Sequence, residues 1–75
     1  MGKLRVLSGR EVCQILQRNG FAAVRQRGSH IAMQKSDGEV TVTVPVPDNN
    51  ELRRGTLAAI IRQSGIPRSE FEYGW

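Results

Sequence analysis

The chain has few of the residues that small proteins use as covalent or metal braces. Its 75 residues include one cysteine, Cys13, and one histidine, His30. An internal disulfide is therefore impossible, and the pair cannot by itself fill the coordination shell of a Cys/His zinc site. We expect no cofactor and no bound metal ion, and a fold that is stabilised by packing.

Long apolar runs are also missing. No stretch approaches the roughly 18 apolar residues that indicate a membrane span, and the basic N-terminus lacks the uninterrupted apolar segment of a secretory signal. A chain this short buries only about 60% of the surface that it exposes when unfolded, which leaves room for one small core. We expect a single domain over residues 1–75, located in the cytoplasm and not bound to a membrane.

Acidic residues are outnumbered and scattered. Asp48, Glu51, Glu70 and Glu72 have neither paired-carboxylate nor metal-ligand spacing, which disfavours a metal-dependent nuclease. The 11 Lys and Arg residues exceed the 7 Asp and Glu residues, for a net charge of +4, and most of the cations are arginine. The planar guanidinium suits bidentate contact with phosphate, so the composition favours a polyanionic partner. On charge alone, a basic domain without such a partner is equally consistent.

A first helix is predicted near the N-terminus. The segment Ser8-Gly9-Arg10-Glu11 has the S-x-x-E form of a capping box, and Gly20 is well placed to end the helix that follows. The apolar side of this helix is narrow and needs a partner surface. It consists of Val12, Ile15 and Leu16, with Cys13 at its margin as a small core residue rather than a reactive thiol.

The apolar period then changes to that of strands. Strands are predicted over residues 21–26, 29–35 and 39–44, with a turn at Arg27-Gly28 and an Asp-Gly hairpin turn at Ser36-Asp37-Gly38. In the second strand, the alternation that buries Ile31 and Met33 against the helices puts His30, Ala32 and Gln34 on the open face. In the third strand, the expected inward set is Val40, Val42 and Val44, and the outward set is Thr41 and Thr43.

The remaining elements are a loop, a helix and a turn. Residues 45–50 are predicted to form a loop, because two prolines remove ladder donors and the Asp and Asn residues favour turns. Thr56 is predicted to cap a second helix that stops at Gly65, and a last short turn is expected to pin Phe71 to the core. The order is helix, three strands, helix. The simplest such α+β fold, α-β-β-β-α, is a three-stranded antiparallel sheet with both helices on one face, the topology of the double-stranded-RNA-binding domain.

His30 is the candidate catalytic residue. Histidine has the ordinary pKa nearest to neutrality, which suits it to moving protons. The residues expected to bind phosphate beside it are Arg25, Arg27, Gly28, Ser29 and Lys35. Gly28 would allow the backbone to approach a phosphate, and Ser29 adds a hydroxyl donor. Considered alone, these residues also fit a plainer interpretation, a surface histidine beside an ordinary Gly-Ser turn.

Arg53, Arg54 and Thr56 form a second candidate phosphate site. The two arginines precede the expected helix N-terminus, whose free amides favour anions. A solvated charge pair beside an ordinary threonine cap is equally consistent with this pattern.

Several runs, in this order, resemble the HicA toxin family of bacterial toxin-antitoxin systems. They are residues 19–21, 25–30, 42–45, 52–57 and 60–66, together with Phe71. Gly-Ser-His at the second strand, combined with a Gly-Thr-Leu helix start and the closing Ser-Gly-Ile, makes the resemblance specific.

The resemblance implies a double-stranded-RNA-binding-like fold, metal-independent cleavage of mRNA, and neutralisation by a HicB-like antitoxin. We expect a monomer when the antitoxin is absent. It places the catalytic role on His30. Members often have further histidines where this chain has Ile31 and Pro47. A single imidazole is then left to act as base and acid, or the leaving oxygen is protonated by water or an arginine-bound network. The alternative hypothesis is a non-catalytic module of the same fold that binds RNA or the antitoxin.

Overall fold

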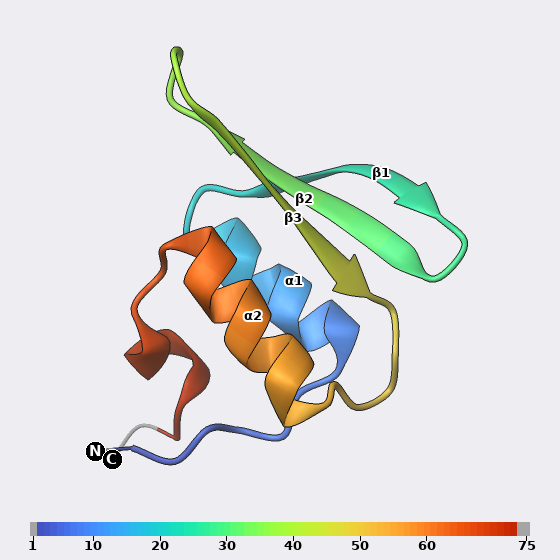
Figure 1. Cartoon of the computed structure of the whole chain (residues 1–75), viewed down its shortest axis with the longest axis vertical. Helices are drawn as coiled ribbons and strands as arrows, with labels where there is room; N and C mark the ends of the chain where they lie inside the picture. Colours follow the sequence, from blue (N-terminus) through green and yellow to red (C-terminus); the bar gives the residue numbers. More distant parts are fainter. Residues whose placement is uncertain (1, 74–75) are drawn as a thin grey trace.

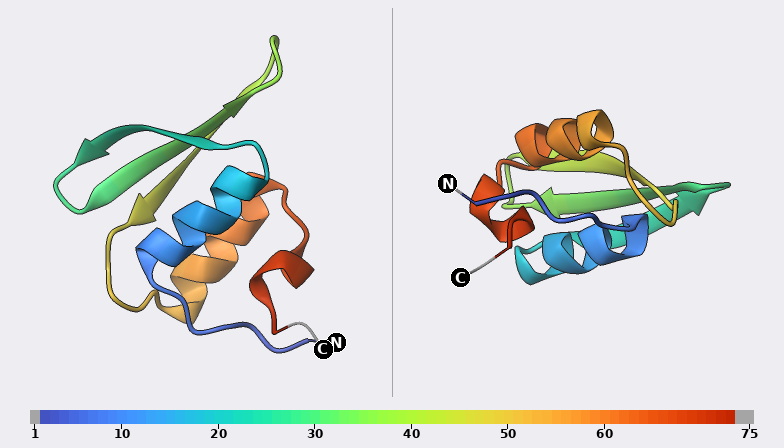
Figure 2. Two further views of the ribbon diagram at one scale, coloured as in Figure 1. Left: turned by 180° about the vertical axis from the view of Figure 1, so that it is seen from behind. Right: turned by 90° about the horizontal axis from the view of Figure 1, so that it is seen from below.

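The protein has an α+β fold in the order α-β-β-β-α. The structure is a computed structural model that describes residues 2–73. Its elements are α1 (Gly9–Arg18), β1 (Ala22–Arg27), β2 (His30–Ser36), β3 (Thr41–Pro47), α2 (Arg54–Ser64) and the 3₁₀ helix η1 (Arg68–Phe71). The strands form one antiparallel sheet in the order β1-β2-β3. Both helices lie side by side against the same face of this sheet (Figures 1 and 2), so the predicted element order and layering are confirmed.

The start of α1 is closed by the predicted capping box. The Glu11 backbone N–H donates to Ser8 Oγ at 3.1 Å, and the Ser8 N–H donates to Glu11 Oε1 at 2.8 Å. The bond from the Ser8 backbone lowers the pKa of Glu11 below its ordinary value. Arg10 adds two hydrogen bonds to the Asp48 carboxylate, at 3.1 and 3.2 Å. Side chains from two segments therefore hold this helix end.

One core lies between the helices and the sheet. Its members are fully or almost fully buried, and burial of each large aliphatic or aromatic side chain stabilises the fold by about 1.5–3 kcal/mol. Phe71 is completely buried at the end of η1, as expected. Cys13 is a buried core residue, and burial raises the pKa of its thiol. The sheet contributes Ile31, Met33, Val44 and Val46, and the helices contribute Val12, Ile15, Leu16, Leu57 and Ile60.

The predicted end of the third strand is wrong. β3 continues through Pro45 and Pro47, where a loop was expected, and it pairs with β2 over that length. β3 is an edge strand, and alternate residues direct their backbone groups to opposite edges. The Asp48 N–H donates to the Ser29 carbonyl oxygen across the sheet, so the two prolines, one and three residues earlier, direct their nitrogens to the open edge. No ladder bond is lost there.

The valines of β3 that face the core therefore lie two residues further along the chain than predicted. Val40 is 59% exposed and belongs to the turn, because its N–H donates to Asp37 Oδ1 at 2.9 Å and its carbonyl accepts from the Asp37 N–H. The inward set is Val42, Val44 and Val46 instead of Val40, Val42 and Val44.

The predicted cap of the second helix is also wrong. α2 begins at Arg54 with Arg53 at the N-cap position, where no side chain makes a capping hydrogen bond, and Thr56 lies inside the first turn. The chain is anchored just before this point, because the N–H of the buried Leu52 donates to the Leu7 carbonyl at 2.8 Å. Helical bonding then starts from the Arg53 carbonyl. The helix stops at Gly65 with φ of 72°, as predicted.

The segments near the two termini run side by side. Leu4 pairs with Glu72 in an antiparallel bridge, flanked by hydrogen bonds from the Arg5 N–H to the Phe71 carbonyl and from the Tyr73 N–H to the Lys3 carbonyl. The N-terminal segment is therefore held under the helices (Figure 1). Over residues 2–73, no helix combines the length and apolarity needed to cross a membrane.

Candidate active site

A tight hairpin places His30 at the first position of β2. Arg27 and His30 pair across the sheet, so Gly28 and Ser29 form a two-residue turn. Gly28 has φ of 55°, whereas no described residue other than glycine has a positive φ. A positive φ at the first turn position alone is the type II′ pattern, which matches the twist of the flanking strands. The turn itself therefore requires glycine at position 28.

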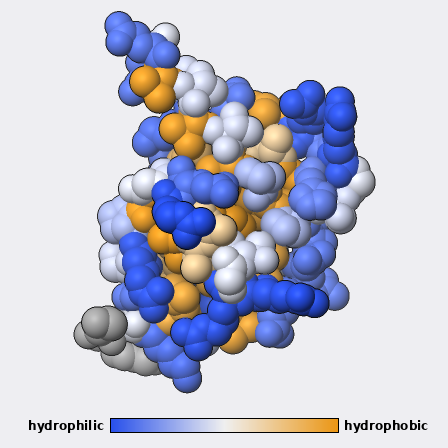
Figure 3. Space-filling model, viewed as in Figure 1, coloured by the Kyte–Doolittle hydropathy of each residue, from blue (hydrophilic) through white to orange (hydrophobic). Residues whose placement is uncertain are grey.

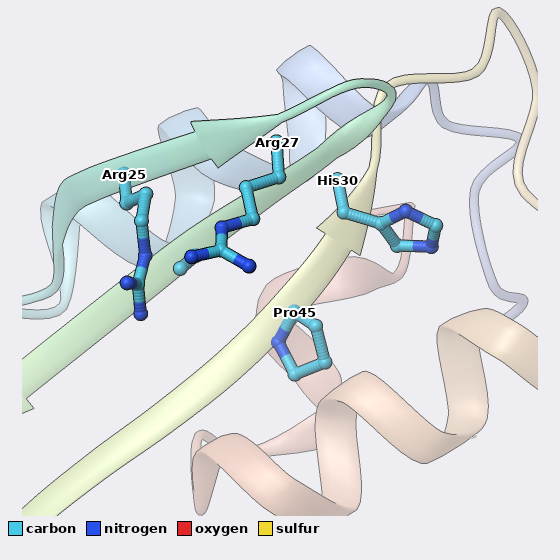
Figure 4. A pocket seen from close by; sticks show the side chains of 5 residues that line it. Arg25, Arg27, His30 and Pro45 are labelled. Atoms are coloured by element: carbon cyan, nitrogen blue, oxygen red, sulfur yellow. The ribbon is translucent and has the colours of Figure 1, made fainter.

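His30 projects from the open face of the sheet, as predicted. The side chain is exposed, and within residues 2–73 its imidazole takes part in no hydrogen bond or ion pair. Arg25 and Arg27 of β1 extend over the same face (Figure 4), because residues that pair directly share a face and Arg27 pairs with His30. With Ala32 and Pro45, these three side chains line a hollow of about 250 Å³, which we call the sheet hollow.

A second hollow adjoins the first between β3 and α2. It encloses about 400 Å³, shares His30 and Pro45 with the sheet hollow, and we call it the helix hollow. Its other lining residues are Pro47, Gly55, Thr56, Ala59, Ile60 and Gln63. Thr56, Ala59 and Gln63 lie three, four and seven positions apart, so they share one face of α2.

The electrostatics of these hollows are those of an anion site. Neither hollow is lined by a carboxylate, and the ion pairs of the described residues engage Arg10 and Arg68 and neither Arg25 nor Arg27. The first turn of α2 contains no acidic residue and has no side-chain cap. Its free amides carry the positive end of the helix dipole, and two residues of this turn, Gly55 and Thr56, line the helix hollow. Residues 2–73 hold no group of three or more His, Cys, Asp or Glu side chains arranged to bind a metal ion.

The other predicted phosphate-binding residues lie elsewhere. Lys35 stands five residues beyond His30 on β2, about 16 Å along an extended strand, and its ammonium lies over the Phe21 ring at 6.0 Å. Arg53 and Arg54 line a third hollow on the other side of the first turn of α2. Of the predicted set, the structure brings Arg25, Arg27 and Thr56 together with His30, which closes the Gly28-Ser29 turn.

Sequence reasoning missed the contributions of Gly55, Gln63 and the two prolines of β3. The spacing of Thr56 and Gln63 was a usable signal, because residues seven apart share a helix face. Both prolines were assigned to a loop, and only the resemblance, in which members often carry histidine at the position of Pro47, pointed to one of them.

Comparison with known families gives one match. The sequence profile of the HicA toxin family of bacterial toxin-antitoxin systems matches residues 9–66. The matched region begins with α1, ends just after α2, and contains all the residues that line the two hollows around His30. A search among curated proteins finds no match.

Proposed function

The chain belongs to the HicA toxin family of bacterial toxin-antitoxin systems, and we propose that it is an endoribonuclease that cleaves cytoplasmic mRNA without a metal ion, using His30. The observation that carries the proposal is the position of His30 where the sheet hollow and the helix hollow meet. Two arginines that form no ion pair with any residue from 2 to 73 flank it on one side, and the uncapped start of α2 flanks it on the other. Membership of the family implies an antitoxin partner, and we propose that this partner is HicB-like.

The proposed reaction is an internal transesterification of RNA. The His30 imidazole removes the proton from a ribose 2′-hydroxyl, and the 2′-oxygen forms a bond to the adjacent phosphorus. The bond from phosphorus to the 5′-oxygen breaks, and that oxygen takes up a proton from the His30 imidazolium or from water. The products are a 2′,3′-cyclic phosphate and a 5′-hydroxyl. One imidazole can serve both steps because it regains its starting protonation state at the end.

The neighbouring groups have separate roles in this proposal. The guanidinium groups of Arg25 and Arg27 stabilise the negative charge that develops on the phosphorane oxygens. The first-turn amides of α2 and the Thr56 hydroxyl bind a phosphate oxygen from the opposite side. Gln63 offers an amide that can hydrogen-bond a base or a ribose.

Cleavage by the purified protein tests the proposal. A fluorescent RNA should be cut in the presence of EDTA, and His30→Ala should lower the rate by about 10²–10⁴-fold, the usual contribution of a general acid-base. The variant should keep the unfolding midpoint of the wild type, because the exposed His30 side chain forms no hydrogen bond or ion pair with the described residues 2–73. A His30→Ala protein that cuts as fast as the wild type would overturn the mechanism.

A second candidate is a non-catalytic module that binds RNA or the antitoxin. It is favoured by the single histidine of the chain. Members of the family often carry further histidines at the positions of Ile31, which is a core residue here, and of Pro47, which lines the helix hollow. Induced expression in a bacterial host separates the two candidates. Growth arrest that His30→Ala relieves supports the ribonuclease, whereas absence of arrest with intact RNA binding supports the module.

A further inference from the structure

A third hollow concentrates positive charge away from His30. It encloses about 170 Å³, and its lining includes four cationic residues, Lys3, Arg5, Arg53 and Arg54, and one carboxylate, Glu51. We call it the basic hollow. It holds four of the 11 cationic residues of the chain, and Lys3 and Arg5 were not among the predicted phosphate-binding residues.

The tertiary structure brings these cations together from distant parts of the sequence. The pairing of Leu4 with Glu72 keeps the N-terminal segment extended, so Lys3 and Arg5, two residues apart, lie on the same side of it. The hydrogen bond from Leu52 to Leu7 fixes this segment beside the start of α2. Hydrophilic side chains accordingly dominate the lower end of the molecule in Figure 3, where Figure 1 shows the N-terminal segment passing beneath α2.

These charges are poorly neutralised inside the protein. None of the four cations takes part in an ion pair within the described part of the chain. Arg5 acts over a longer range on Glu11, whose pKa it helps to lower. Like charges that are gathered without partners repel one another, so an anionic ligand would relieve an unfavourable interaction.

We propose that the basic hollow binds backbone phosphates of the same RNA strand that is cut at His30, on the far side of the first turn of α2 from the scissile bond. The inference rests on the proposed function. Gly55 and Thr56 line the helix hollow, and Arg53 and Arg54 line the basic hollow, so the two hollows flank the first turn of α2. A helix with its side chains is about 10 Å across, so an RNA strand that reaches both hollows has to pass around the start of α2.

The chemistry of the basic hollow favours RNA over a peptide. Arginine binds phosphate through two parallel hydrogen bonds, and the positive end of α2 joins the two hollows into one cationic track. Protein interfaces centre on desolvated pockets filled by a few large side chains. The leucines of the basic hollow are buried, which leaves Val6 as the exposed apolar residue of its lining.

RNA binding by variants in a His30→Ala background tests this inference. Fluorescence anisotropy would measure the affinity for a 12-nucleotide and a 4-nucleotide RNA over a range of salt concentrations. Lys3→Ala/Arg5→Ala and Arg53→Ala/Arg54→Ala should each lower the affinity for the longer RNA severalfold more than for the shorter one. Each pair should also reduce the salt slope by about 1.4, because a lost phosphate contact on single-stranded nucleic acid removes about 0.7.

A matched control separates a binding site from a general effect of net charge. Arg18→Ala/Arg62→Ala removes the same charge from exposed positions outside all three hollows, and it should change neither the length dependence nor the salt slope. An equal loss in this control, or an equal loss for both RNA lengths, would overturn the inference. So would intact RNA binding with weakened antitoxin binding, which would assign the basic hollow to the protein partner.

The binding format keeps this inference independent of the cleavage proposal. The binding assay in the His30→Ala background does not depend on RNA cleavage. If the wild-type protein proved to have no nuclease activity, the length dependence of RNA binding would still test the basic hollow. Thermal unfolding of each double variant identifies any loss that comes from misfolding.

Discussion

The two helices begin in opposite ways although they cover the same face of one sheet. α1 starts with a complete capping box, an acidic residue in its first turn and a two-bond contact from Arg10 to Asp48. α2 starts with Arg53 at the N-cap position, no capping side chain and no acidic residue. At the start of the first helix, the Glu11 N–H donates to Ser8 Oγ and the Gly9 N–H to the Asn49 carbonyl. The start of the second helix has no side-chain cap and adjoins the helix hollow that His30 also lines. Stability is concentrated at one helix start, and the capacity to bind an anion at the other.

Substitution of the glycine in the first turn of each helix, Gly9 in α1 and Gly55 in α2, should produce the largest difference in stability between the two helix starts. A Cβ added to Gly9 would collide with the carbonyl oxygen of Pro47, a backbone atom that cannot turn aside, whereas a Cβ on Gly55 meets nothing within 4 Å. Gly9→Ala should destabilise the fold by about 1–3 kcal/mol or more through overpacking. Gly55→Ala should stabilise it by about 0.5–1 kcal/mol through helix propensity.

Urea unfolding of both variants measures this difference, and RNA affinity provides a second readout. Gly55→Ala should weaken RNA binding, because the new methyl group enters the helix hollow beside the α2 amides. If Gly9→Ala were as stable as the wild type, the close packing of α1 on the end of β3 would be refuted.

Loss of the capping box should have the next largest effect. Ser8→Ala removes the side-chain acceptor for the Glu11 N–H and should cost about 1 kcal/mol of unfolding free energy. Thr56→Ala is the matched control at the other helix, because Thr56 does not cap α2. That control should change stability little and RNA binding more. Chemical denaturation of the two variants would contradict the comparison if their losses were equal.

A cap introduced at α2 should move stability and binding in opposite directions. Arg53 has the extended backbone of an N-cap, with φ of −66° and ψ of 150°, so Arg53→Ser can accept a hydrogen bond from the first turn. The gain in unfolding free energy should be about 0.5–1 kcal/mol. RNA affinity should fall, since a cation is lost and the amides gain an internal partner. Arg62→Ser, in the last turn of α2, is the control, and equal changes in both variants would argue against a special role for the α2 start.

Acid should weaken the start of α1 more than that of α2, and this is the smallest predicted effect. The pKa of Glu11 is lowered by its hydrogen bond from the Ser8 backbone, below an ordinary value of 4.5. Its stabilising contribution is therefore complete above the unfolded-state pKa and is lost as the pH falls through the folded-state pKa. The pKa of Asp37 is lowered in the same sense by backbone N–H groups of Val40 and Glu39.

Glu11→Gln isolates the contribution of the capping box to this acid sensitivity. The amide keeps an acceptor for the Ser8 N–H, so stability at pH 7 should change little. The urea midpoint should fall less steeply than in the wild type when the pH is lowered from about 5 to about 3. The remaining decline should include the contribution of Asp37. A Glu11→Gln protein with the full acid sensitivity of the wild type would show that the capping box does not titrate.

The predictions from sequence succeeded where one short segment contains all the interacting groups. Ser8 and Glu11 are three residues apart and form the capping box that their spacing predicted. Gly65 adopts the left-handed backbone that ends α2. The alternation around Ile31 correctly put His30 on the open face, because the period of a strand needs no knowledge of its partner.

The predictions failed where the partner of a segment decides its structure. Two prolines argue against an inner strand but are compatible with an edge, and which edge β3 forms depends on the order of strands in the sheet. Thr56 is a good capping residue, yet the anchor from Leu52 to Leu7 starts the helix earlier.

By itself, the sequence determined the order of the elements, the apolar faces that form the core, the caps and turns built from neighbouring residues, and the presence of a single histidine beside a tight turn. These properties depend on local backbone preferences and on the period of side chains along a helix or a strand. Only the tertiary structure decided which residues of α2 share a hollow with His30, which cations gather in the basic hollow, and that the start of α2 stays open between them. Those properties depend on packing between residues that are tens of positions apart, and no local preference encodes that packing.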